Sequence, residues 1–250
     1  MDHTIAPVVA AFALASAYAG GRWLMPAEGA EHGLWSRRRR ISTAAGVSVA
    51  YVFVDVLPEL GAQNQAIVAA AGGEPLLFAE QRVYLLALLS FVVLYGIEHL
   101  VLASRRQRGR SAEAVANVAT YGLHLGGFAA YSALIGYLLS ERLERGPVAL
   151  AVYTIAMAVH FLIVDHSMFE QHRGRYARAG RPVLAASVLA GALLGIMTTL
   201  PEAAFARLFA LLAGGVVITS LRAELPDERE GRFWPFCLGA VVFAAILLFA

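Results

Sequence analysis

Apolar residues in this chain are gathered into eight runs, and short polar segments separate them. A helix crosses the hydrocarbon core of a bilayer with about 20 apolar residues, because each residue advances it by about 1.5 Å. We therefore predict eight membrane-spanning helices, with approximate ranges 5–19, 41–60, 83–102, 115–139, 148–169, 182–200, 205–221 and 233–249. Nothing is left over for a soluble domain, so residues 1–250 are expected to form one all-α transmembrane domain.

The composition favours the same prediction. The mean hydropathy is +0.64, and 59% hydrophobic with 15% charged residues is typical of a polytopic membrane protein. The net charge of +2 is a sum over loops and implies no nucleic-acid partner. Cys237 is the only cysteine, which excludes an intramolecular disulfide and a cysteine-based metal site. The lipid bilayer is therefore the partner that the composition indicates.

The arginines predict the orientation of the chain. All 20 basic residues are arginine, which suggests a GC-rich bacterial genome, and 16 of them lie in the segments after the first, third, fifth and seventh runs. Loops that remain in the cytoplasm collect positive charge. We therefore expect these four segments inside and both termini outside, in a multi-pass protein of the plasma or inner membrane.

Ionisable residues lie within the apolar runs and follow a pattern in depth. On a rise of about 1.5 Å per residue, two carboxylates lie towards the outer side, two histidines near mid-membrane, and acids with histidines towards the inner side. In that order they are Asp55 and Glu59; His124 and His160; and Glu98, His99, Asp165 and His166. Hydrocarbon does not tolerate such groups, so we expect them to converge inside the bundle as a polar column.

Imidazoles with carboxylates indicate metal binding or proton movement. They suit zinc-type divalent metals, and a proton relay uses the same side chains. His160 and Asp165 are five residues apart, about 140° around a helix, so they cannot chelate one ion together. A mid-membrane metal site must draw on different helices. If His124 and His160 share an ion, their rings must come within about 3–4 Å of each other.

Three stretches resemble helices of the ZIP family of divalent metal transporters. The second ZIP helix is similar to residues 46–60 (GVSVAYVFVDVLPEL). The third is similar to residues 88–100 (LLSFVVLYGIEHL), and the seventh to residues 208–228 (LFALLAGGVVITSLRAELPDE). Asp55 takes the place of the histidine of the second helix, and Pro58 and Glu59 match its end. Glu98 falls on the glutamate of the third helix. Eight spans with both termini outside also match this family.

The resemblance implies transport of a divalent, zinc-type metal ion through a ZIP-like bundle, in which the ion is the substrate and no organic cofactor is needed. The resemblance and the depth pattern together predict His124, His160, Asp165 and His166 as metal ligands. The transport path that the resemblance implies includes Asp55, Glu59, Glu98 and His99. It also implies a homodimer.

The fourth and fifth runs depart from the family's motifs. Residues 124–129 (HLGGFA) keep only the histidine of the fourth helix, and residues 160–165 (HFLIVD) keep the first histidine and the last acid of the fifth. Two alternatives to transport therefore stay open. One is a non-transporting ZIP relative that acts as a metal or ligand sensor or as an accessory protein. The other is an intramembrane metal-dependent hydrolase; transport involves no catalytic residue.

Glycine pairs predict where helices pack closely. Gly122 with Gly126 and Gly191 with Gly195 are small residues four apart, which lets two helices approach. We expect both pairs to lie at helix contacts and assign them no chemistry.

Overall fold

The described part of the chain is helical throughout. A computed structural model describes residues 5–24, 37–70, 81–106, 113–224 and 233–249, which contain no strand. The α-helices are α1 Ile5–Leu24, α2 Arg37–Tyr51, α3 Leu57–Ala70, α4 Arg82–Arg106, α5 Glu113–Tyr137, α6 Leu139–Glu144, α7 Pro147–Arg175, α8 Arg181–Met197, α9 Glu202–Glu224 and α10 Phe233–Phe249. Two π-helical turns join them, η1 Val52–Val56 and η3 Tyr176–Gly180. All eight predicted runs fall on these helices.

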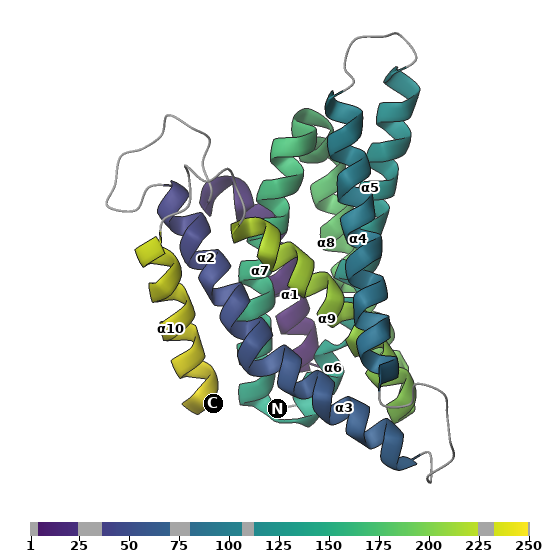
Figure 1. The fold of residues 1–250 in the computed structure, drawn as a ribbon, viewed down its shortest axis with the longest axis vertical. Coiled ribbons are helices and arrows are strands. Elements are labelled where there is room, and N and C mark those ends of the chain that lie inside the picture. The colour runs from purple at the N-terminus through teal and green to yellow at the C-terminus, as the bar shows by residue number, and fades with distance from the viewer. Residues whose placement is uncertain (1–4, 25–36, 71–80, 107–112, 225–232, 250) are drawn as a thin grey trace.

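Several helices extend beyond the predicted runs. The run predicted from residue 41 begins at Arg37, because arginine is a good helix former and its long side chain reaches water from within a helix. The run predicted to end at residue 169 continues as α7 to Arg175. In Figure 1 the helices lie side by side as an elongated bundle, with α1 and α7 near its middle.

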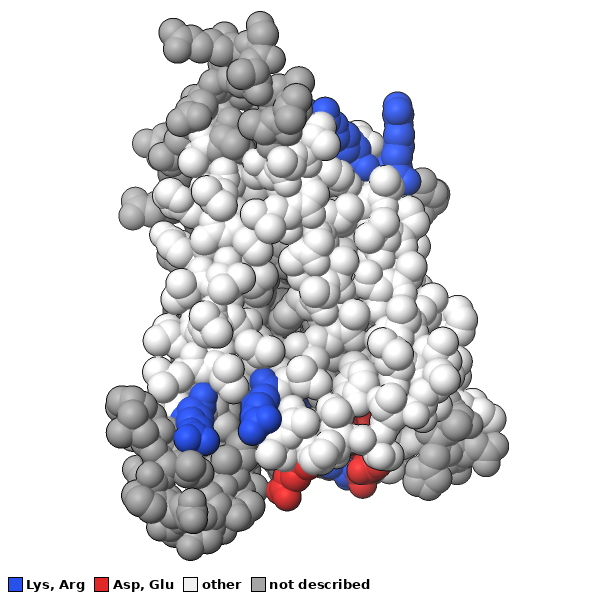
Figure 2. Space-filling view, turned by 90° about the vertical axis from the view of Figure 1, so that its right-hand side faces the viewer, with Lys and Arg blue, Asp and Glu red and all other residues white. Residues whose placement is uncertain are grey.

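The apolar character of the helices is that of a membrane protein. Five helical stretches among the described residues are long and apolar enough to span a bilayer: Arg39–Gln65, Arg82–Val101, Val118–Glu144, Pro147–Met197 and Glu202–Ser220. Ile5–Gly20 and Phe233–Phe249 are apolar but shorter. Figure 2 shows charged side chains near the two ends of one face, with a band that carries none between them. Such a band is what a bilayer would cover.

The helices bend where the sequence requires it. Pro58 has no N–H for the usual bond to residue 54, and the turn before it widens into η1, where the Leu57 N–H bonds to the Val52 carbonyl. Gly146, at φ 117°, makes the turn between α6 and α7 in a conformation that favours glycine. Arg173, at φ 35°, interrupts the regular geometry near the end of α7.

Glycines set the closest helix contacts, and only part of that pattern was predicted. Gly191 and Gly195 of α8 pack against the α5 backbone, where a Cβ would collide with carbonyl oxygens. The prediction for this pair is confirmed. The prediction for Gly122 and Gly126 is wrong, because nothing lies near their missing Cβ atoms. The contact of α5 with α8 instead uses Gly136.

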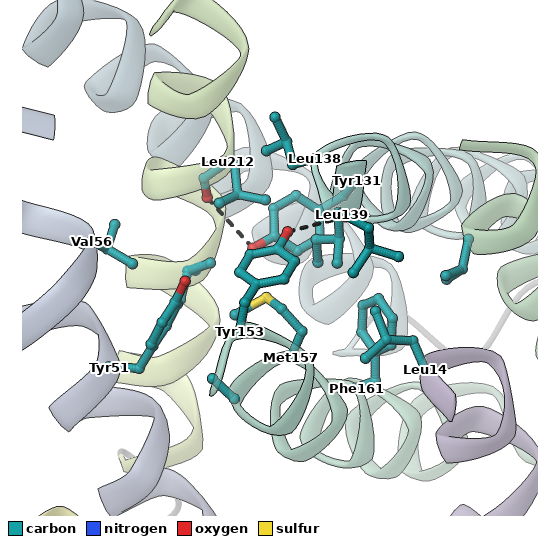
Figure 3. Packing of buried hydrophobic residues seen from close by; sticks show 14 of the residues in the cluster. Leu14, Tyr51, Val56, Tyr131, Leu138, Leu139, Tyr153, Met157, Phe161 and Leu212 are labelled. Carbon is teal, nitrogen blue, oxygen red and sulfur yellow. Dashed lines mark hydrogen bonds between the residues drawn. The ribbon is translucent and has the colours of Figure 1, made fainter. Parts of the chain in front are cut away.

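Tyrosines fill much of the middle of the bundle. Tyr51, Tyr131 and Tyr153 are almost fully buried among leucine, methionine and phenylalanine side chains (Figure 3). The Tyr153 hydroxyl donates to the Ile135 carbonyl over 3.0 Å, and that of Tyr131 to the Leu212 carbonyl over 3.5 Å. Bonds to backbone carbonyls satisfy these hydroxyls and tie α7 and α9 to α5. The centre is therefore packed rather than hollow.

Candidate functional site

Three helices bring one carboxylate and two imidazoles into a continuous hydrogen-bonded chain. Glu98 of α4 and His124 of α5 are buried, with 6% and 0% of their surface exposed. His124 Nε2 lies 3.1 Å from Glu98 Oε1, and His124 Nδ1 lies 2.9 Å from Nε2 of His172, which is half-buried on α7. We call Glu98, His124 and His172 the histidine relay. It leads from the half-buried end of α7 to a buried carboxylate.

Neighbouring side chains hold the histidine relay in place. Gln171 Nε2 donates to Glu98 Oε2 over 3.3 Å and to the Ser167 hydroxyl over 3.1 Å. The ring of Tyr121 meets the His172 ring edge-on at 4.8 Å, and the Phe128 ring lies 5.1 Å from that of His124. Both rings of the relay are thus packed as well as hydrogen-bonded.

The kink in α7 follows directly after the relay. His172 is the last residue before Arg173, whose positive φ breaks the helical geometry. A positive φ is uncommon for a residue other than glycine. The C-terminal end of α7 is therefore a bent segment with an imidazole at the bend.

The histidine relay can take up a proton and change the direction of a hydrogen bond. With an ionised Glu98, His124 donates from Nε2, so a neutral His124 must accept at Nδ1 from the N–H of His172. A protonated His124 donates from both nitrogens, and His172 must then accept. Histidine is the side chain that changes charge near physiological pH. One added proton would therefore reverse the hydrogen bond between His124 of α5 and His172 of α7.

His160 is not part of this relay. It is 1% exposed on α7, its Nε2 lies 3.3 Å from the Thr219 hydroxyl of α9, and its Nδ1 has no partner. The ring of Tyr131 lies 5.7 Å away. His124 and His160 thus contact different residues, and no contact between the two rings places them at one point. Within the described residues no three His, Cys, Asp or Glu are placed to hold a metal ion.

Asp165 forms an ion pair rather than an open ligand. Its two oxygens accept from Arg181 Nε over 2.7 Å and Nη2 over 2.9 Å, and Oδ1 also accepts from the Tyr176 hydroxyl over 2.8 Å. The carboxylate is 2% exposed. A fork-to-fork pair of this kind is strong and directional. It joins α7 to the start of α8 across η3, and it uses the oxygens that a metal would need.

The acids predicted at the outer end are also paired with arginines. Asp55, half-buried in η1, accepts from Arg142 Nη2 of α6 over 3.3 Å. Glu59 of α3 accepts two bonds from Arg145, one of them over 2.6 Å, and one from Gln63 over 2.6 Å. Both carboxylates that were predicted to line a transport path are therefore neutralised by an arginine from the α5–α7 connection.

Arg142 is buried and lies next to two aromatic rings. It is 4% exposed, and the rings of Tyr153 and Phe209 each lie 5.2 Å from its guanidinium carbon. Aromatic faces stabilise a desolvated cation, and its partner Asp55 supplies the opposite charge. A fixed guanidinium therefore stands beside the acid that the ZIP resemblance places on the metal path.

The residues of the predicted polar column differ in how deeply they are buried. Glu98, His124, His160 and Asp165 are buried, which confirms the prediction that they face the interior; Asp55 is only partly so. His166 is half-buried on α7. His99 lies exposed on α4, with its ring near Tyr95, so the structure does not bring it together with the inward-facing group.

Sequence analysis missed the arginines and one histidine of these clusters. Arg142 and Arg145 are three apart, so they share a helical face, and the acids Asp55 and Glu59, four apart, share another. This complementary spacing was a usable signal. His172 follows Asp165 by seven residues, or two turns, and so lies on the inward side of α7.

Comparisons with known proteins do not assign the chain. No family model, curated protein or solved structure matches it. The function must therefore be inferred from the clusters themselves.

Proposed function

We propose that this chain is a multi-pass membrane protein that senses protons from the cytoplasmic side through the histidine relay, and that it does not conduct divalent metal ions. It would have eight spans with both termini outside, as the distribution of arginines predicts. In support, α1 begins and α10 ends at the same end of the bundle in Figure 1.

The observation that carries the proposal is the bridging position of His124. Both of its ring nitrogens are engaged, one with the carboxylate of Glu98 and the other with the imidazole of His172. A metal ion needs a free nitrogen lone pair from each imidazole, directed at one point. A proton needs only a donor at one end and an acceptor at the other. The geometry therefore favours proton binding over metal binding.

The arginines at the other end of the bundle support the proposal that the outer side is closed to divalent metal ions. Arg142 and Arg145 neutralise the two acids there, and Arg142 is also clamped between aromatic rings. A doubly charged ion and a guanidinium about 6 Å apart repel by about 5 kcal/mol at an effective dielectric constant of about 20. Asp55 is already compensated and adds little to offset this. A proton bound at the histidine relay does not pass this point.

Divalent metal transport is the second candidate, and the composition of the relay favours it. Two imidazoles and one carboxylate from three helices are the ligand set of many zinc sites. For Glu98, His124 and His172 to hold one ion, the His124 ring would have to release one partner and reorient. Transport would further require the Arg142 and Arg145 pairs to open.

Hydrogen–deuterium exchange of the purified full chain in nanodiscs tests proton sensing. We expect the amides of residues 166–175 to exchange faster at pH 5.5 than at pH 8, after correction for intrinsic rates, because proton uptake reverses the His124–His172 hydrogen bond and so loosens the contact of α7 with α5. His124→Gln should abolish this difference. His99→Gln, a histidine on the exposed face of α4, should preserve it. An equal pH response in the His124→Gln variant would refute the relay as the sensor.

Zinc uptake into proteoliposomes separates the two candidates. With a zinc-sensitive dye inside the vesicles, we expect no saturable uptake above protein-free vesicles. Saturable uptake that disappears in the Glu98→Gln variant would establish transport and overturn the closed outer side. A pH response in exchange without uptake would support the sensor.

A further inference from the structure

A surface groove between α2 and α10 is independent of the relay. Its cavity volume is about 730 Å³, and it is lined by Arg39, Phe233, Trp234, Pro235, Cys237, Leu238 and Val241. A volume of this order is typical of sites that hold a small molecule or cofactor. All but one of these residues are apolar or a thiol, and the exception is an arginine.

The groove exists because two glycines bring the helices together on one side. Gly46 of α2 packs against the backbone of Phe236, and Gly239 of α10 packs against that of Thr43. The opposite stripe of α10 is left facing outward. Trp234, Leu238 and Val241 form it, spaced four and three apart on one face, with 79%, 51% and 68% of their surface exposed. This stripe is therefore a wall of the groove open to the surrounding bilayer.

Among the described residues that line the groove, the charged one, Arg39, lies at one end. Arg39 lies in the first turn of α2, within the run of four arginines that begins this helix. Phe233 and Trp234 begin α10, and aromatic residues at helix ends mark the interface between hydrocarbon and headgroups. A cation and an aromatic belt at one end, with apolar side chains below them, match a phospholipid in shape and in charge.

We propose that this groove binds a phospholipid with an anionic headgroup, with its phosphate at Arg39 and an acyl chain along Trp234, Leu238 and Val241. Basic residues beside membrane helices recognise anionic headgroups in this way, and a guanidinium pairs with a phosphate through two parallel N–H donors. A free phosphate would leave the apolar wall unused. A zwitterionic lipid would fill the apolar part but gain less from the arginine.

The single cysteine of the chain reports on the groove directly. Cys237 lines it and is partly accessible, so a bound lipid slows its reaction with N-ethylmaleimide. The full chain in detergent micelles is mixed with either phosphatidylglycerol or phosphatidylcholine at equal mole fraction, and labelling is followed by intact mass. We expect labelling to be about five-fold slower with phosphatidylglycerol, the difference typical of one arginine at a charged lipid surface.

Two variants and two further probes decide the result. Arg39→Gln should remove the difference between the two lipids, whereas Arg178→Gln, an exposed arginine of η3, should keep it. Equal labelling rates in both lipids, or selectivity that survives Arg39→Gln, would overturn the proposal. Protection by inorganic phosphate alone would show a simple anion site instead. Protection that depends on protein concentration and not on lipid would show that a second copy covers the groove.

Discussion

Replacing Asp165 by Asn removes the negative charge of the α7–α8 pair with little change in shape. Asp165 accepts three hydrogen bonds, two from Arg181 and one from Tyr176, and is 2% exposed. Two unit charges about 4 Å apart attract by about 4 kcal/mol at an effective dielectric constant of about 20. Removing one partner of a buried pair costs about 3–5 kcal/mol, because the other charge stays uncompensated.

The partial exposure of the Arg181 side chain favours a cost near the lower end of the range of about 3–5 kcal/mol. It is 14% exposed and lies where α8 begins, so part of the guanidinium can regain water. We therefore expect Asp165→Asn to lower the free energy of unfolding by about 3 kcal/mol. Tyr176→Phe, which removes one neutral donor, should cost about 1 kcal/mol.

A double-mutant cycle measures this interaction. Asp165→Asn, Arg181→Gln and the double variant are unfolded by SDS in mixed micelles and followed by tryptophan fluorescence. We expect a coupling energy of about 2 kcal/mol, well above the ~0.5 kcal/mol within which independent sites add. Additive costs would refute the ion pair. Weaker zinc binding without loss of stability would restore Asp165 as a metal ligand.

Two further predictions concern packing and the buried cation. Gly191→Leu should destabilise the bundle by more than 3 kcal/mol because it forces α8 away from the α5 backbone, whereas Gly126→Leu, with open space at its Cβ, should cost less than about 0.5 kcal/mol by the same unfolding assay. Arg142→Met should destabilise by about 3 kcal/mol because it leaves Asp55 without its cation, and adding Asp55→Asn should recover part of that loss; equal stability of the single and double variants would contradict the pairing.

The helices themselves could be predicted because one signal, the length of the apolar runs, determined them. A long apolar run in a bilayer can satisfy its backbone hydrogen bonds by forming a helix. The eight apolar runs therefore predicted where the helices lie. The length of an apolar run does not predict where a helix bends. The sequence contains Pro58, yet it does not show that the turn before it widens into η1 or that Asp55 in this turn pairs with Arg142 of α6. Arg173 likewise carries no sequence mark of a positive φ.

The candidate site could be predicted only in part. Burial of Glu98, His124, His160 and Asp165 followed from the cost of placing ionisable groups in lipid. Their partners did not, because depth along each helix says little about rotation around it. Arg142 lies between two predicted spans, and nothing in the sequence placed it beside the rings of Tyr153 in α7 and Phe209 in α9. Only the fold therefore shows which arginine pairs with each of Asp55, Glu59 and Asp165.

The protonation of His124 is the central claim, and nitrogen NMR measures it most directly. Chemical shifts of ¹⁵N in an imidazole distinguish a nitrogen that donates from one that accepts. In ¹⁵N-histidine-labelled full chain, the His124 signals are assigned by their loss in the His124→Gln variant. We predict that Nδ1 of His124 changes from an acceptor to a donor between pH 8 and pH 5, and that Glu98→Gln alters the pH of this change. His124 signals that stay unchanged over this range would contradict the proposed function.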